Sequence, residues 1–390
     1  MIKITSSSQL KKNKKFRLSI FKKPFCFKEK QKKYKLYEMP KFKSNFFKCK
    51  FGKKDIEEKI LFISGPARSG NHLLLSMLDN HTQLANEVGE DDFLRTIFSY
   101  VNINEKKVVE KFKKGDINFI LKCSGQPKLG RGQGIDKWKK LKEIFLSGKK
   151  SKIWSGSQPE GKAHITDFQG LVPNINYSAF KNHLIKNRNS IINAKNFLEI
   201  FQIYLNAKKK LIHNYKEKEN KYKFKNRWTA SGLRRELFYL LNKSKKVVSL
   251  VPIRKFENFY FSYAKTRHFT KKVDQKALND LWGHWRHKVI DYLLLKKKYP
   301  KNIIIVKFED IILNPEKTAK KISKKLNIKF NKSMLKTTVL GKDSLGNSSF
   351  KKQKNIKGKF YKTSINRKLD GVVMPFEYRE IYKLINKLSI

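Results

Sequence analysis

A short apolar segment that runs into a glycine-containing loop and then a helix constrains the fold of this chain more than any other feature. The segment KILFIS (59–64) has the length and composition of a buried strand, and Gly65 follows it directly. Apolar residues between Leu73 and Leu78 then recur at helical spacing, so we expect a helix over 69–81. A helix that begins at a loop turns its free backbone N–H groups and the positive end of its dipole toward that loop. The order of these elements therefore predicts an anion-binding loop.

The loop GPARSGNH has the glycine spacing of a nucleotide-triphosphate loop but lacks its lysine and hydroxyl. Gly65 and Gly70 match the pattern G-x-x-x-x-G-K-[ST], whereas Asn71 and His72 stand where that pattern needs Lys and Ser/Thr. The groups that reach the β- and γ-phosphates and hold magnesium are therefore missing. Arg68 supplies a positive charge within the loop instead. We expect a site for a phosphate-like group, with an ordinary strand-to-helix turn as the alternative.

The rest of the chain alternates predicted strands with predicted helices. Further strands are expected at 118–124, 246–254 and 302–311. Helices are expected at 137–146, 178–216, from Phe256 onward, and at 274–299, 314–326 and 376–388, with a loop at 147–177. Strands that alternate with helices form a parallel sheet covered on both faces. The predicted fold class is α/β, with three layers in the order α/β/α around a central parallel sheet.

A second anion-binding element is expected where the strand at 246–254 ends. Arg254 is its last residue, and Ser262 follows in the first turns of the next helix. An arginine at the carboxyl end of a strand and a hydroxyl on the following helix can converge on one phosphate. Taken singly, Arg254 could equally be a surface arginine, and Ser262 a serine at a helix contact.

Together these elements resemble those of the sulfotransferase family that uses 3′-phosphoadenosine 5′-phosphosulfate (PAPS), whose fold is P-loop-like. GPARSGNH is similar to the family's P-[RK]-S-G-T loop for the 5′-phosphosulfate, and RKFENFYFS is similar to its R-x-P-x-x-x-x-x-S element for the 3′-phosphate. The segments at 281–293, 302–328, 346–350 and 362–369 are similar to later family elements in the same order. The resemblance covers about 60 to 390, apart from a poorly matched segment from about 125 to 230.

The resemblance implies which residues bind PAPS. These are Gly65, Pro66, Arg68, Ser69, Gly70, Asn71, His72, Arg254, Ser262, Ser364 and Arg367. Asn71 and His72 depart from the family, which has threonines in this part of the loop, and Lys255 and Phe256 stand where Asp and Pro are common. Because one nucleotide carries both phosphates, Arg68 must lie on the same face of the molecule as the second element, within the span of one doubly phosphorylated adenosine.

The resemblance also implies in-line transfer of a sulfuryl group to an acceptor hydroxyl, which needs a general base. Arg68 and the backbone amides after it would stabilise charge on the leaving phosphate. Ser124 stands where cytosolic members carry a histidine, so we expect the base in the loop LANEVGEDDF, with Glu90 favoured over Glu87. Lys122 matches a family lysine that steadies the sulfonate, at the end of the second predicted strand. A solvated acidic loop and a solvated lysine are the alternatives.

The charge balance is strongly basic, since 90 Lys and Arg against 32 Asp and Glu give a net charge of +58. Lysine is spread along the whole chain, whereas a nucleic-acid binder concentrates it on one face, so we expect no obligatory nucleic-acid partner. Residues 1–55 are predicted to be a basic, poorly ordered arm, and 56–390 one domain with an acceptor-side insertion at about 125–230. The sequence has no run of about 18 apolar residues and no secretory apolar region, so we expect no transmembrane segment and a cytoplasmic location.

We therefore expect a PAPS-dependent sulfotransferase whose acceptor is a hydroxyl on a carbohydrate or small metabolite. No metal is expected, because His284 and His287 share a helix face but have no third ligand at a suitable spacing. Two alternatives stay open. A kinase-like P-loop phosphotransferase would turn over ATP with magnesium, and a non-catalytic basic polyanion-binding protein would bind nucleic acid with a steep dependence on salt. The sequence leaves the oligomeric state open.

Overall fold

The structure is a computed structural model that describes residues 59–85, 93–123, 177–211, 224–228, 234–267, 273, 275–339, 342–343, 360, 365 and 368–390. Its centre is a sheet of five strands in the order β2-β3-β1-β4-β5, and every neighbouring pair is parallel. The strands are β1 (Lys59–Ile63), β2 (Leu84–Ala85), β3 (Phe224–Trp228), β4 (Val247–Ile253) and β5 (Ile303–Lys307). A separate antiparallel pair consists of β6 (Thr338–Val339) and β7 (Lys342–Asp343).

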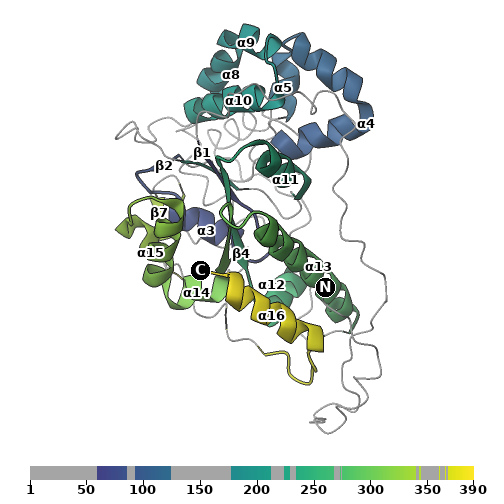
Figure 1. Cartoon of the computed structure of the whole chain (residues 1–390), viewed down its shortest axis with the longest axis vertical. Helices are drawn as coiled ribbons and strands as arrows, with labels where there is room; N and C mark the ends of the chain where they lie inside the picture. Colours follow the sequence, from purple (N-terminus) through teal and green to yellow (C-terminus); the bar gives the residue numbers. More distant parts are fainter. Residues whose placement is uncertain are drawn as a thin grey trace, which may run out of the picture.

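Helices cover both faces of the sheet and form a further layer beyond one end of it (Figure 1). One face carries α3 (Asn71–Leu78), α14 (Phe308–Leu313), α15 (Pro315–Leu326) and the short 3₁₀ helix η3 (Lys332–Leu335). The other face carries α11 (Arg234–Lys243), α12 (Phe256–Arg267), α13 (Gln275–Lys298) and α16 (Phe376–Leu388). The end layer consists of α4 (Phe93–Lys113), α5 (Ile117–Cys123), α8 (Tyr177–Lys186), α9 (Arg188–Ile192) and α10 (Phe197–Leu211).

Alternate residues of the central strand supply two separate hydrophobic clusters, one on each face of the sheet. Ile60 and Phe62 of β1 belong to the cluster under α11, α12, α13 and α16. Leu61 and Ile63 belong to the cluster under α3, α14 and α15. Side chains alternate between the two faces of a strand, and a parallel sheet is stable when both of its faces are buried. The predicted α/β/α arrangement is confirmed.

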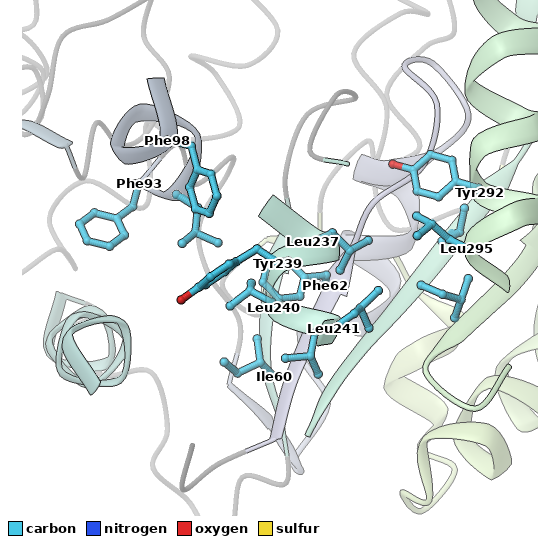
Figure 2. Close-up of a cluster of buried hydrophobic side chains, with 14 of the residues drawn as sticks. Ile60, Phe62, Phe93, Phe98, Leu237, Tyr239, Leu240, Leu241, Tyr292 and Leu295 are labelled. Atoms are coloured by element: carbon cyan, nitrogen blue, oxygen red, sulfur yellow. The ribbon is translucent and has the colours of Figure 1, made fainter. Parts of the chain in front are cut away.

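The first of these clusters continues from the sheet into the helical end layer. Figure 2 shows Tyr239 of α11 between Ile60 of β1 and Phe98 of α4. The rings of Phe98 and Tyr239 lie 5.5 Å apart with their planes at 70°, an edge-to-face geometry that aromatic pairs favour. Phe93, the first residue of α4, stacks on Tyr204 of α10 at 3.9 Å. One continuous apolar core therefore holds the end layer on the sheet.

The strand predicted at 118–124 is wrong, because residues 118–123 belong to α5 (Ile117–Cys123). Gly115 ends the preceding helix with a φ of +59°, and Asp116 then accepts the backbone N–H of Phe119 at 2.8 Å. A glycine at this position ends one helix, and the aspartate N-cap after it begins the next. A short apolar run alone does not distinguish a buried helix from a buried strand. Lys122 therefore lies on a helix of the end layer rather than at a strand end of the sheet.

Other boundaries also differ from those predicted. The segment 224–228, which we assigned to the insertion, is β3 and pairs with β1 in the central sheet. The strand predicted at 302–311 ends at Lys307, where α14 begins. The helix predicted at 178–216 is three helices, and Asn196 and Glu199 exchange hydrogen bonds at the start of the last one. The predicted elements at 137–146 and 147–177, and the arm at 1–55, lie outside the described residues.

A buried histidine fastens the end of α3 to the segment before η3. Nε2 of His81 lies 2.8 Å from the carbonyl oxygen of Lys329, and Nδ1 accepts the backbone N–H of Gln83 at 3.0 Å. These partners assign the single proton of a neutral ring to Nε2. Burial lowers the pKa of His81 below its ordinary value, although the hydrogen bond to Lys329 opposes this change. Protonation would place two N–H donors, those of Nδ1 and Gln83, against each other.

We therefore expect the free energy of unfolding to decrease as the pH falls below about 6.5, the ordinary pKa of histidine. The unfolded chain takes up a proton there while native His81 stays neutral, so stability rises with pH by at most about 1.4 kcal/mol per pH unit for this one proton. The contribution of neutral His81 to the free energy of unfolding is complete above about pH 6.5 and is lost as the pH falls through the lowered native pKa. Urea unfolding of the wild type and His81→Gln measures it, and the stability difference between the two should shrink on acidification. A difference that does not change with pH would contradict the assignment.

Candidate active site

The predicted anion-binding elements lie at the carboxyl edge of the sheet, where the direction of the chain connections changes. From β1 the chain leads to β2 and β3 on one side, whereas from β4 it leads to β5 on the other. Ligands of open α/β sheets bind at such a switch point, outside the carboxyl ends of the strands. The loop after β1 and the turn after β4 both face this point. The backbone N–H of Ser64 donates to the carbonyl of Leu250 at 2.9 Å, so the start of the loop is held on β4.

The loop between β1 and α3 has a backbone shape that depends on close contacts. A Cβ atom on Gly65 would overlap the carbonyl oxygen of Pro252, and one on Gly70 would overlap the ring of Phe308. Gly70 has a φ of +100° and Arg68 a φ of +62°, both in the left-handed region that a residue with a side chain adopts only at a cost. The loop thus lies directly against the ends of β4 and β5.

The side chain of Asn71 closes the loop on itself. Its Nδ2 donates to the carbonyls of Gly65 and Pro66 at 3.2 and 3.3 Å. Both amide hydrogens of the side chain are engaged in this way, so the contribution of Asn71 to an anion is limited to its backbone N–H. His72 lies half-buried in the first turn of α3.

Ser69 offers a buried group that suits an anion. The residue is fully buried, and its Oγ has no hydrogen-bond partner among the residues that the structure describes. Buried hydroxyls almost always have a partner, so one without a partner is a feature that needs explanation. Ser69 lies two residues before the first residue of α3, at a helix start where free backbone N–H groups and the helix dipole favour a negative charge. The donors present at this point therefore fit a phosphate-like group.

The second element lies in direct contact with the loop. Nε of Arg68 donates to Oγ of Ser262 on α12 at 3.3 Å. Nη1 of Arg254, directly after β4, donates to the carbonyl of Arg68 at 3.3 Å. Two segments separated by 186 positions in the chain thus meet on one side of the molecule. The two elements touch through the side chain of Arg68, which agrees with the expectation that both lie on one face.

Arg254 is a deeply buried cation whose guanidinium lies over an aromatic ring. Only 1% of its surface is exposed, and Cζ of its guanidinium lies 4.2 Å from the ring centroid of Phe308, within the range of a cation–π contact. Nε1 of Trp285 on α13 donates to the carbonyl of Arg254 at 2.8 Å. Glu309, the residue after Phe308, is also buried. Trp285 and Phe308 lie in the segments 281–293 and 302–328, which resemble family elements, and the sequence analysis predicted no role for either residue.

The remaining predicted site residues fall into two groups. Glu87, Glu90, Ser364 and Arg367 lie outside the described residues, so their roles stay predictions. Lys122 is described as part of α5, and the strand end that its role required is not there. Glu309 at the start of α14 accepts the backbone N–H of Lys255 before α12. Within the described residues no group of three or more His, Cys, Asp and Glu is placed to hold a metal ion.

The fold and this cluster define a class of protein: an α/β/α domain in which the two elements predicted to bind anions meet at the switch point of a parallel sheet. The family model described as "Sulfotransferase domain" matches residues 58–376, which is most of the chain. The chain therefore belongs to the sulfotransferase domain family, whose general activity is sulfuryl transfer. No match was found among curated proteins. None of the helices that the structure describes is both long and apolar enough to cross a membrane.

Solved structures of sulfotransferases are similar to this chain at low sequence identity. The sulfotransferase domain of the Synechococcus PCC 7002 olefin synthase is 15% identical, with 87% of this chain and 98% of that chain covered and a TM-score of 0.45. The sulfotransferase domain from the curacin biosynthetic pathway is 13% identical, with coverage of 85% and 99% and a TM-score of 0.42. Sulfotransferase STF9 from Mycobacterium avium is 9% identical, with coverage of 85% and 76% and a TM-score of 0.39.

Proposed function

We propose that this protein transfers a sulfuryl group from PAPS to a hydroxyl of a carbohydrate or small metabolite. The observation that supports the donor most directly is the contact between Arg68 and Ser262, at 3.3 Å. It joins the loop expected to bind the 5′-phosphosulfate to the helix expected to bind the 3′-phosphate. A nucleotide with one phosphate on the 3′ side and one on the 5′ side of its ribose needs two adjacent anion-binding elements. ATP instead needs one site for its triphosphate chain, together with magnesium ligands.

In the proposed reaction the acceptor oxygen attacks sulfur in line with the bridging oxygen to the 5′-phosphate. The new S–O bond forms as the bridging S–O bond breaks, and adenosine 3′,5′-bisphosphate leaves with the electron pair. The proton of the acceptor hydroxyl passes to a general base, for which Glu90 is our first candidate and Glu87 the second. Neither step needs a metal in this scheme, since arginines and backbone amides supply the positive charge.

The residues of the described cluster have separate parts in this scheme. Arg68 and the backbone N–H groups of Ser69, Gly70 and Asn71 stabilise the charge that develops on the leaving 5′-phosphate. Gly65 and Pro66 shape the loop, and His72 lies beside it. Arg254 and Ser262 hold the 3′-phosphate, and Ser364 and Arg367 close over the nucleotide.

A sulfate-transfer assay tests this function. We expect transfer of radiolabelled sulfate from PAPS to at least one member of a panel of glycans, phenols and lipids, with inhibition by adenosine 3′,5′-bisphosphate. Arg68→Ala should weaken binding of this bisphosphate about tenfold or more, because one hydrogen bond to a charged group contributes about 1.5–3 kcal/mol. Arg379→Ala removes an equal charge from an exposed position on α16 and is the matched control.

Two results would contradict the proposal and favour an alternative. Magnesium-dependent ATP turnover that the bisphosphate does not inhibit would indicate a phosphotransferase. Tight binding to DNA or RNA that weakens steeply with salt, together with indifference to the bisphosphate, would indicate a polyanion-binding protein.

A further inference from the structure

Glu309 is a buried carboxylate that accepts hydrogen bonds from the residue after Arg254 and from the first turn of α12. Its Oε1 accepts the backbone N–H of Lys255 at 3.1 Å and Nδ2 of Asn258 at 2.8 Å. Only 7% of its surface is exposed. Lys255 directly precedes α12 and Asn258 lies in its first turn, so one oxygen atom from α14 satisfies donors at the start of another helix. Free N–H groups at a helix start need such an acceptor, which usually comes from the residue before the helix.

The same carboxylate interacts electrostatically with Arg254. Burial raises the pKa of Glu309, and the hydrogen bonds from Asn258 and Lys255 and the positive charge of Arg254 oppose this rise. A buried carboxylate beside a buried guanidinium costs desolvation free energy that a pair of apolar side chains would avoid. A serine at position 255 would cap α12 without this cost, so the placement of Glu309 must have a further effect.

We propose that Glu309 is a positioning residue that fixes the turn after β4, so that the guanidinium of Arg254 is held ready for the 3′-phosphate. This inference rests on the proposed function. The side chains of Phe308 and Glu309 both contact this turn. The ring of Phe308 supports the guanidinium of Arg254, and Glu309 holds the backbone of the next residue. Because β4 and β5 end at the same level, with Ile253 paired to Lys307, the first turn of α14 lies directly beside Arg254.

Two substitutions of Glu309 distinguish a positioning role of its side chain from a role of its charge. Glutamine keeps an acceptor oxygen at the place of Oε1 and removes the charge, whereas aspartate keeps the charge and is one methylene too short to reach Lys255 and Asn258. If position matters, Glu309→Gln should bind adenosine 3′,5′-bisphosphate within about threefold of the wild type. Glu309→Asp and Glu309→Ala should each lose about tenfold, the equivalent of about one hydrogen bond.

The experiment compares two nucleotides by calorimetry. Adenosine 3′,5′-bisphosphate uses the Arg254 element, and adenosine 5′-monophosphate does not. We expect the affinity for the monophosphate to change less than about twofold in every Glu309 variant, a selectivity that general loss of folding would not produce. Asp310→Ala is the matched control. It removes the neighbouring acid of α14, whose side chain pairs with Lys307 rather than with the start of α12. Thermal unfolding of each variant reports on the fold.

The outcomes separate this inference from the proposed function. A wild type that binds no bisphosphate would overturn both. Bisphosphate binding by the wild type together with normal binding by Glu309→Asp and Glu309→Ala would overturn the positioning role alone. Weak binding by Glu309→Gln with normal binding by Glu309→Asp would also overturn it, because the charge and not the contact would then matter.

Discussion

Arg254→Ala is expected to weaken the binding of adenosine 3′,5′-bisphosphate by about 100-fold or more, since two hydrogen bonds to a charged group contribute about 3–6 kcal/mol. It should also lower the free energy of unfolding by about 1–3 kcal/mol, because the carbonyl of Arg68 loses a hydrogen-bond donor and the buried carboxylate of Glu309 loses the favourable positive charge of Arg254. Arg254 is almost fully buried, and the carboxylate left behind is that of Glu309. Calorimetry measures the first effect and urea unfolding the second.

A double variant separates binding from folding in this experiment. Arg254→Ala combined with Glu309→Gln removes both charges, so stability should recover in part while the affinity for the bisphosphate stays low. Arg379→Ala, at an exposed position, should change neither quantity. Normal bisphosphate affinity in Arg254→Ala would show that this arginine does not contact the 3′-phosphate.

Gly70→Ala is expected to lower the free energy of unfolding by about 2–5 kcal/mol and to abolish binding of the bisphosphate. Two costs add at this position. A side chain in the left-handed region costs about 1–2 kcal/mol, and overpacking of a filled site costs about 1–3 kcal/mol. The φ of Gly70 is +100°, and an added Cβ would overlap Phe308 Cδ2 and lie 2.9 Å from its Cε2. Displacement of this ring would also remove the surface on which Arg254 rests.

The chain contains a matched control for this glycine. Gly283 lies within α13, and an added Cβ there would meet no atom within 4 Å. Gly283→Ala should therefore stabilise the fold by about 0.5–1 kcal/mol, because alanine has less conformational freedom to lose in a helix. If Gly70→Ala and Gly283→Ala unfold at the same urea concentration, the loop is not constrained as its contacts indicate.

The loop after β1 could be predicted because its signals are local. A buried strand, two glycines and an amphipathic helix follow one another within 59–81, and each reports on its own backbone. The helix begins at Asn71, close to the predicted start. The resemblance added Arg254 and Ser262 to the same site, and the contacts of Arg68 with both residues agree with that expectation.

Two elements escaped prediction for a different physical reason. The apolar run predicted as a strand at 118–124 fits a buried strand and a buried helix equally well. The aspartate cap before it decides in favour of a helix. The strand β3, which lies between β2 and β1, reads FKNRW and has no apolar run to mark it. Its place in the sheet comes from pairing with β1 and β2, which are distant in the chain. Pairing of this kind depends on backbone hydrogen bonds that any sequence can make.

Local patterns in the chain were thus enough to predict an α/β fold, the strand–loop–helix unit around Gly65–Gly70 and, through resemblance, the family to which the chain belongs. They reflect interactions between residues a few positions apart, such as helix capping and glycine conformation. The contacts of Phe308 and Trp285 with Arg254, and of Glu309 with Lys255, became visible only in the folded chain. Strand order and register bring the ends of β1, β4 and β5 together, and contacts between residues so far apart leave no periodic trace in the sequence.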